Sequence, residues 1–270
     1  MTSTRRVVQV DVSGADVELA SDALWRAGPS GVSEVSLPDG RVRLTADVAD
    51  PAAIEPPWTV AVIEAGTDDH LDAWRAWAAP VRAGRSVVLQ PAWLPPGEAD
   101  PGDVVVLLDP GRTFGSGSHP STRLVAAALE DLVHEGEQVL DVGCGSGVLA
   151  VTALCLDAAT AVGVDVDPAA PEVARANAGR NGVEDRLRVT TRPVSELTGL
   201  FGVVVANIGQ RVLVDLAPSL VARVRPGGFL VLSGLLDEQA DVVVSACHGC
   251  AELERRRLEG WVAPILVRQS

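Results

Sequence analysis

Apolar and polar residues alternate with two different periods in the first 65 residues. Residues 15–28 (ADVELASDALWRAG) repeat apolar positions at the spacing of an amphipathic helix. The runs around this helix instead alternate or cluster apolar residues as short strands do, with turn formers between them. These strand-like runs are residues 7–12, 32–37, 41–48 and 58–65. The pattern predicts a small α+β domain in the order strand, helix, strand, strand, strand.

This order resembles a ferredoxin-like domain whose second helix is shortened, and we predict the domain over residues 1–66. Residues 67–103 are predicted to be a helix followed by a linker. In that helix Leu71, Trp74 and Trp77 share one face, and a proline ends the pattern. The linker contains the segment PAWLPPGEADPGD, which is rich in turn formers.

Strand-like and helix-like segments alternate over residues 104–270, which is typical of a parallel sheet covered by helices on both faces. Only a short turn separates the last two strand-like runs, so they are predicted to pair as an antiparallel hairpin. Helices are predicted to begin near Pro120, Gly147, Pro168, Gln210 and Leu235. The strand-like runs are VVVLL, QVLDVG, AVGVDV, RLRVTT, FGVVVAN, GGFLVLSG, ELERRRL and WVAPILVR.

Composition and charge narrow the range of functions. The chain has no run of about 18 apolar residues, and its first residues lack the apolar block of a secretory signal, so we expect a cytoplasmic protein without a membrane segment. The net charge of −14 argues against direct nucleic-acid binding and favours a basic protein partner. Cys247 and Cys250 have metal-ligand spacing but no second pair, so no metal is predicted. No long exposed apolar segment is evident, and a monomer is expected.

A glycine run, DVGCGSG, begins at Asp141 directly after a strand-like segment. Its glycines allow a sharp turn and the close approach of a ligand to the backbone. The run departs from the dinucleotide fingerprint, because Val148 stands where the last glycine should be. A tight strand-to-helix turn without any ligand therefore remains open at this point.

The next strand-like run ends at Asp165, 24 residues after Asp141. A carboxylate at this position can accept hydrogen bonds from both hydroxyls of a ribose. Asp167 and Pro168 have another explanation, because Asp is a good N-cap and Pro is favoured at the first helical position. We therefore assign Asp165 to ligand binding and Asp167 to helix capping.

The acidic glycine run followed by an acid after the next strand resembles the class I methyltransferase fold, which binds S-adenosylmethionine. The segment LDPGRTFGSGSHPSTRL (108–124) is similar to one family within it, the methyltransferases of large-subunit ribosomal protein eleven. Further similar segments are GVDVDP, NAGRNGV, VVANI and GWVAPILVR. The resemblance covers about residues 69–268. It implies an α/β, Rossmann-like, seven-stranded sheet with a C-terminal antiparallel hairpin, preceded by the small ferredoxin-like domain.

The resemblance also implies site residues. Phe114 matches an aromatic in the loop over the cofactor, and Thr122, Gly143, Asp165 and Asn207 match cofactor contacts. With two further members of the glycine run, the predicted S-adenosylmethionine site comprises Phe114, Thr122, Asp141, Gly143, Gly145, Asp165 and Asn207. Ser118 and His119 are equally well explained by a helix-capping loop, so His119 receives no catalytic role.

Asn207 is the predicted catalytic residue. Its side-chain oxygen can accept a hydrogen of a neutral substrate amine and direct the lone pair at the methyl group. The alternative is that Asn207 caps the helix beginning near Gln210. Gln210 and Arg211 depart from the pattern expected after this asparagine, which affects the wall facing the substrate.

The leading hypothesis is an S-adenosylmethionine-dependent protein N-methyltransferase that acts on lysine or amine groups, with large-subunit ribosomal protein eleven as substrate. A second hypothesis keeps the cofactor but changes the acceptor to another protein or a small amine. A nicotinamide-dependent oxidoreductase is a third, which Val148 disfavours. The fourth is a binding module that retains the fold without catalysis.

Overall fold

The computed structural model describes most of the chain, in two compact units, Met1–Ala78 and Ala79–Ser270. The described residues are 5–269 except residues 27–31, 38, 47, 49–50, 52–53, 55–57, 66–77, 96, 98, 112 and 114. The tryptophan-rich helix predicted before Pro80 therefore lies almost wholly outside them.

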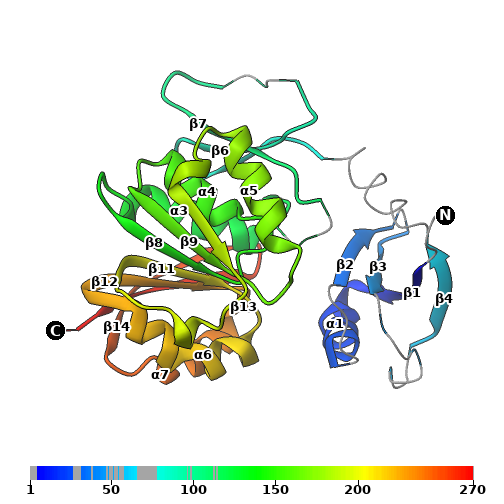
Figure 1. Ribbon diagram of the computed structural model, residues 1–270. Helices are drawn as coiled ribbons and strands as arrows, with labels where there is room; N and C mark the ends of the chain where they lie inside the picture. Colours follow the sequence, from blue (N-terminus) through cyan, green and yellow to red (C-terminus); the bar gives the residue numbers. More distant parts are fainter. Residues whose placement is uncertain are drawn as a thin grey trace. The chain divides into compact units, whose positions relative to one another are not determined.

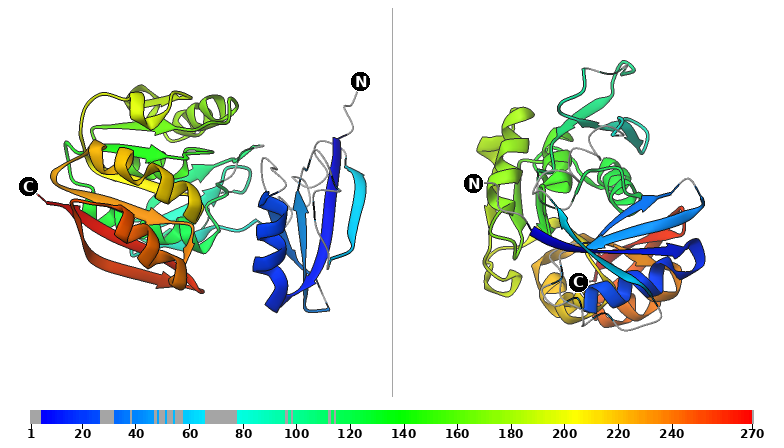
Figure 2. Two further views of the ribbon diagram at one scale, coloured as in Figure 1. Left: turned by 90° about the horizontal axis from the view of Figure 1, so that it is seen from below. Right: turned by 90° about the vertical axis from the view of Figure 1, so that its right-hand side faces the viewer.

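The N-terminal unit contains a four-stranded sheet in the order β2-β3-β1-β4, with every neighbouring pair antiparallel. Its elements are β1 (Arg5–Ser13), the 3-10 turn η1 (Gly14–Asp16), α1 (Val17–Arg26), β2 (Val32–Ser36), β3 (Arg41–Ala46) and β4 (Val60–Ala65). Since β3 lies between β1 and β2, which α1 connects, the unit is a split β-α-β arrangement. The alternation in β1 turns Val8, Val10 and Val12 to one face, where they pack with Leu24 of α1. Figure 2 shows α1 lying along one face of this sheet.

The C-terminal unit is built on a large sheet in the order β10-β9-β8-β11-β12-β15, with β14 and the short β13 both paired to β15. Its strands are β8 (Gln138–Val142), β9 (Thr160–Val164), β10 (Leu187–Thr190), β11 (Phe201–Asn207), β12 (Val224–Ser233), β13 (Leu235–Leu236), β14 (Cys250–Leu258) and β15 (Trp261–Arg268). The strands from β10 to β12 are parallel, whereas β15 is antiparallel to β12 and forms the predicted hairpin with β14.

Helices cover both faces of this sheet (Figure 1). They are α3 (Pro120–Leu132), α4 (Val148–Cys155), α5 (Ala170–Arg180), α6 (Gln210–Arg223) and α7 (Asp237–Ala246), with 3-10 turns η3 (Glu184–Arg186) and η4 (Val194–Glu196). In β8, Val139 packs in the core beneath α3, α4 and α5, whereas Leu140 and Val142 pack beneath α6 and α7. Two covered faces explain why the central strands read as unbroken apolar runs.

One predicted strand lies outside the large sheet. Residues 104–108 were expected to begin the parallel sheet, but they form β7 (Val104–Leu108) of a separate three-stranded sheet in the order β5-β6-β7. The other strands, β5 (Val81–Ala83) and β6 (Val87–Pro91), lie in the stretch expected to be helix and linker. Leu89 and Leu108 pack in the core with α3, and the Glu130 carboxylate of α3 accepts the Val87 backbone N–H at 2.9 Å. Helix contacts rather than the large sheet therefore hold these strands.

Candidate functional site

The glycine run forms the turn between β8 and α4. Gly143, Gly145 and Gly147 all have positive φ angles, of 75°, 49° and 78°. A Cβ atom on Gly143 would overlap the side chain of Ile208, and one on Gly147 would lie 2.7 Å from the Cβ of Ala174. The requirement for glycine is therefore set by the turn and by its close neighbours.

The two acids of the predicted cofactor site lie beside this turn. Asp165 accepts the Gly145 backbone N–H at 2.7 Å through Oδ2, and the Asp167 backbone N–H at 2.9 Å through Oδ1. Asp141 is 1% exposed, and its Oδ2 accepts the Ala150 backbone N–H at 3.0 Å. Its Oδ1 is buried without a hydrogen-bond partner in the described part of the chain. The pKa of Asp141 is raised to about 7, mainly by burial; the charge of Asp165 acts in the same direction, and the hydrogen bond from Ala150 opposes it.

Asp167 caps the turn before α5 rather than α5 itself. Its Oδ1 accepts the Ala169 backbone N–H at 2.8 Å, whereas the helix begins at Ala170. The expected helix start at Pro168 is therefore two residues early. Pro171 occupies the first turn of α5, where its missing N–H has no intrahelical partner to lose.

Thr122 and Asn207, 85 residues apart in the sequence, are joined by a hydrogen bond. The Asn207 side-chain nitrogen donates to the Thr122 hydroxyl at 3.1 Å, and Thr122 is 1% exposed. The N-cap of α6 is Gly209, so Asn207 does not cap that helix, and the capping alternative is wrong. Because the amide nitrogen is directed at Thr122, the oxygen of the same planar amide points away from Thr122.

Phe114 lies outside the described residues, but its neighbour Gly115 is hydrogen-bonded to the glycine run. The hydroxyl of Ser146, which is fully buried, donates to the Gly115 carbonyl at 2.6 Å. Asn177 of α5 donates to the carbonyls of Asp109, at 3.0 Å, and Ser146, at 2.8 Å. Asn177 and Ser146 were not singled out from the sequence. The signal that could have found Asn177 is a polar residue on the face of a helix that must pack against the sheet.

His119 caps α3, as the capping interpretation expects. Its Nδ1 lies 2.7 Å from the Ser121 hydroxyl and 3.3 Å from the Ser121 backbone nitrogen. The imidazole also contacts Trp261 edge to face, with ring centroids 4.6 Å apart. Burial lowers the pKa of His119, and the nearby Glu259 carboxylate opposes this shift.

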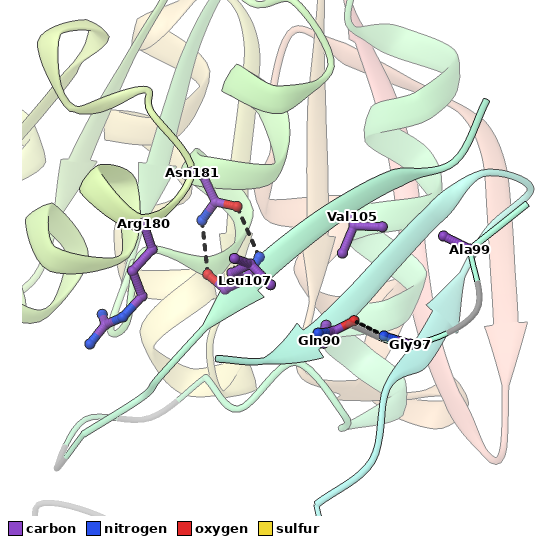
Figure 3. Close-up of a pocket in the computed structure, with 7 residues that line it drawn as sticks. All are labelled: Gln90, Gly97, Ala99, Val105, Leu107, Arg180 and Asn181. Atoms are coloured by element: carbon purple, nitrogen blue, oxygen red, sulfur yellow. Dashed lines mark hydrogen bonds between the residues drawn. The ribbon is translucent and has the colours of Figure 1, made fainter. Parts of the chain in front are cut away.

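A cavity of about 420 Å³ is lined by residues of β6, of β7, of the segment between them and of the end of α5 (Figure 3). Asn181 closes one side by exchanging hydrogen bonds with both backbone groups of Leu107, at 2.9 and 2.8 Å. On another side Gln90 accepts the Gly97 backbone N–H at 3.2 Å. The cavity contains no residue of the predicted site, and its polar side chains are engaged with the protein itself.

Neither a membrane-spanning helix nor a metal-binding cluster is found in the part of the chain that the structure describes. None of its helices is both long and apolar enough to cross a membrane. No group of three or more His, Cys, Asp or Glu side chains could hold a metal ion among these residues. Cys247 is buried just after α7, and burial raises the pKa of its thiol to about 12, so the thiol stays protonated at neutral pH.

Comparison with known proteins connects this site to one family. The sequence model described as "Ribosomal protein L11 methyltransferase (PrmA)" matches residues 47–269. A protein from Geobacter metallireducens named "Ribosomal protein L11 methyltransferase" is 47% identical over 193 residues, which cover 72% of this chain and 62% of that protein. The chain thus spans less than two thirds of this relative.

A protein of the same name from Ralstonia pickettii is 37% identical over 296 residues, covering 96% of this chain and 97% of its own. That alignment is longer than the present chain, so the relative has segments that this chain lacks. The crystal structure of a "ribosomal protein L11 methylase" from Lactobacillus delbrueckii subsp. bulgaricus superposes with a TM-score of 0.66 at 26% identity, covering 72% of this chain and 100% of that one.

This structural match, together with the strand order and the antiparallel last strand, identifies the α/β fold as that of a class I methyltransferase. Family model, relatives and fold agree, and the chain belongs to the ribosomal protein L11 methyltransferase family.

Proposed function

We propose that this chain transfers methyl groups from S-adenosylmethionine to lysine side chains or the terminal amine of large-subunit ribosomal protein L11. The observation that carries the proposal is the meeting of two acids, the glycine run and Asn207 at the carboxyl ends of adjacent parallel strands. Val205 and Ala206 of β11 pair with Asp141 and Val142 of β8, which places Asn207 level with Gly143. Ligands of open α/β sheets bind at this edge.

The residues at this edge suit the chemical groups of S-adenosylmethionine. Asp165 would accept hydrogen bonds from the ribose hydroxyls. The side chain of Val166 is 93% exposed next to it and would provide an apolar surface for the adenine. The unpartnered Oδ1 of Asp141 would face the amino-acid end of the ligand, where an ammonium group can satisfy it. Sequence reasoning missed Val166, although an apolar residue between two acids at a strand end was visible.

When bound, S-adenosylmethionine supplies an electrophilic methyl group: the acceptor nitrogen forms the new N–C bond while the C–S electron pair leaves with sulfur. A lysine amine has a pKa of about 10.4 in water, so the protein must favour its neutral form. The Asn207 oxygen would accept one amine hydrogen and direct the lone pair. The methylated nitrogen is positively charged after the transfer, and it releases one proton to solvent.

Charge and composition support a basic protein substrate. The net charge of −14 attracts cationic partners and repels nucleic acid, and a ribosomal protein is available in the cytoplasm, where we place a monomeric enzyme. Arg211 is exposed and Gln210 half-exposed at the start of α6, next to Asn207. Because these two side chains depart from the expected pattern on the wall facing the substrate, the second candidate acceptor is another protein or a small amine.

Transfer of isotope-labelled methyl groups into purified L11 tests the proposal. We expect label on lysine or the terminal amine, mapped by mass spectrometry, and its loss in Asp165→Ala at a concentration of S-adenosylmethionine that half-saturates the wild type. Glu184→Gln, which alters an exposed acid in η3, is the matched control and should retain the label. If calorimetry shows that S-adenosylmethionine binds but L11 receives no label, the proposed substrate is wrong and the proposed cofactor stands. Absence of binding would contradict both.

A further inference from the structure

Ser233 is a buried polar residue at the same edge of the sheet that the reaction does not use directly. It ends β12 and is 0% exposed. Its hydroxyl lies within hydrogen-bond distance of two backbone carbonyls, Ser121 at 3.2 Å and Val262 at 3.1 Å. A buried hydroxyl needs such partners, and here they belong to α3 and β15. Ser233 therefore joins three elements that are far apart in the sequence.

Ser233 contacts the backbone beside both ends of the Thr122–Asn207 hydrogen bond. Asn207 is its register partner in the parallel pairing of β11 and β12. The Ser233 carbonyl accepts the backbone N–H of Ile208, directly after Asn207, at 3.1 Å. On the other side, its hydroxyl contacts the carbonyl of Ser121, directly before Thr122. One residue thus fixes the strand end that carries the donor and the helix turn that carries the acceptor.

Trp261 supports the same turn of α3 from the β14–β15 hairpin. Its ring meets His119 at 4.6 Å with the ring planes 72° apart, and His119 caps the helix through Ser121. One helix turn further on, Arg123 forms an ion pair with Glu259 at 3.1 Å. Trp261 is also the antiparallel register partner of Leu236 in β13, the short strand that follows Ser233.

We propose that Ser233 and Trp261 are positioning residues for methyl transfer, which hold Thr122 so that it keeps the Asn207 oxygen directed at the acceptor amine. This inference rests on the proposed function. Its physical basis is that the Asn207 amide, once turned away from its acceptor, the Thr122 hydroxyl, no longer presents its oxygen to the amine. Misplacement of a reacting group by about 1 Å can reduce a rate by up to ~100-fold.

A double-mutant cycle tests the role of Ser233. Ser233→Ala should lower the single-turnover rate of methyl transfer at saturating S-adenosylmethionine by ~10-fold, and should lower it no further when Asn207→Ala is already present. Thr152→Val removes another buried hydroxyl, which donates to Val148 within α4, and should leave the rate unchanged. Equal reductions by Ser233→Ala in both backgrounds, or no reduction in either, would overturn the inference.

Trp261 provides a second variant if Ser233→Ala fails to fold. Trp261→Leu should slow transfer, and Trp261→Phe, which keeps an aromatic edge for His119, should restore most of the rate. Equal transfer rates in Trp261→Leu and Trp261→Phe would contradict the positioning role of Trp261. If the wild-type protein does not methylate L11, the proposed function fails. The contact of Ser233 with the Asn207 region is then tested by stability: the losses of unfolding free energy caused by Ser233→Ala and Asn207→Ala should be non-additive. Additive values would then overturn it.

Discussion

The two halves of the candidate site are built in different ways. The half around the glycine run is local, because Asp141, Gly143 and Gly145 belong to one seven-residue segment and Asp165 directly follows the neighbouring strand, β9. The half around Asn207 is assembled from distant segments, with its hydrogen-bond partner 85 residues away and the supporting Ser233–Ser121 contact spanning 112 residues.

This difference indicates that the two halves of the site have separate functions. A local turn with fixed backbone geometry suits a ligand common to many methyltransferases, whereas a site assembled from several elements can be altered at each of them. In this account the glycine-run half sets affinity for S-adenosylmethionine, and the Asn207 half sets the rate of transfer. Variants in each half should therefore change different measured quantities.

The largest expected effect is on cofactor affinity in Asp165→Asn. A hydrogen bond to a charged group contributes roughly 1.5 to 3 kcal/mol, so weakening two of them raises the dissociation constant by ~100-fold or more. Isothermal titration calorimetry with S-adenosylmethionine measures this directly. An unchanged dissociation constant would remove Asp165 from the binding site.

Asn207→Ala should have the next largest effect, on rate. Loss of a preorganised dipole at a reacting group slows transfer by ~100-fold, while the dissociation constant for S-adenosylmethionine should change less than in Asp165→Asn. Single-turnover methylation of L11 separates the two quantities. A variant that binds poorly but transfers normally once saturated would place Asn207 in the cofactor half instead.

Asp141→Asn should change the pH dependence of stability. The pKa of Asp141 in the folded protein is about 7, above that of an unfolded aspartate, about 3.9. The folded state therefore binds this proton more tightly, and the associated stabilisation is lost as pH rises from about 4 to about 7.

Asparagine does not titrate, so without ligand the unfolding temperature of Asp141→Asn relative to wild type should be higher at pH 8 than at pH 5. The variant should also bind S-adenosylmethionine less tightly at pH 8, because the charge that would meet an ammonium group is gone. Parallel stability profiles for the two proteins would show that Asp141 is already ionised at low pH.

The smallest effect is expected for Asp167→Ala, two residues from Asp165. Loss of its capping hydrogen bond to Ala169 should cost about 1 kcal/mol of unfolding free energy. The Asp167 backbone N–H that bonds to Asp165 remains, so cofactor affinity should stay close to that of wild type. Denaturant unfolding and calorimetry together check this, and a large loss of affinity would mean that both acids contact the ligand.

The sequence predicted the turn formed by the glycine run and the place of Asp165 beside it better than it predicted the surroundings of Asn207. The glycine run, Asp165 and the C-terminal hairpin are contiguous patterns whose geometry follows from short-range rules. The partner of Asn207 was not predictable, because a strand-end asparagine can equally cap the next helix, and only the packing of α3 decides between the two. Ser233 gave no signal, since an isolated serine at a strand end is common.

The small sheet shows the same limit in the fold. Residues 104–108 read as a buried strand, yet an apolar run carries no information about which sheet it joins. Its pairing with β6, and the anchoring of the chain before β6 by Glu130 of α3, are tertiary contacts. The residues of β5 and β6 were read as linker because turn formers follow them closely.

The most direct test that the two halves separately set cofactor affinity and transfer rate is the single-turnover rate of L11 methylation as a function of S-adenosylmethionine concentration. It is measured in wild type, Asp165→Asn and Asn207→Ala. We expect Asp165→Asn to raise the half-saturating concentration and to approach the wild-type rate at saturation, whereas Asn207→Ala should lower the plateau. A lowered plateau in Asp165→Asn with a normal plateau in Asn207→Ala would contradict this expectation.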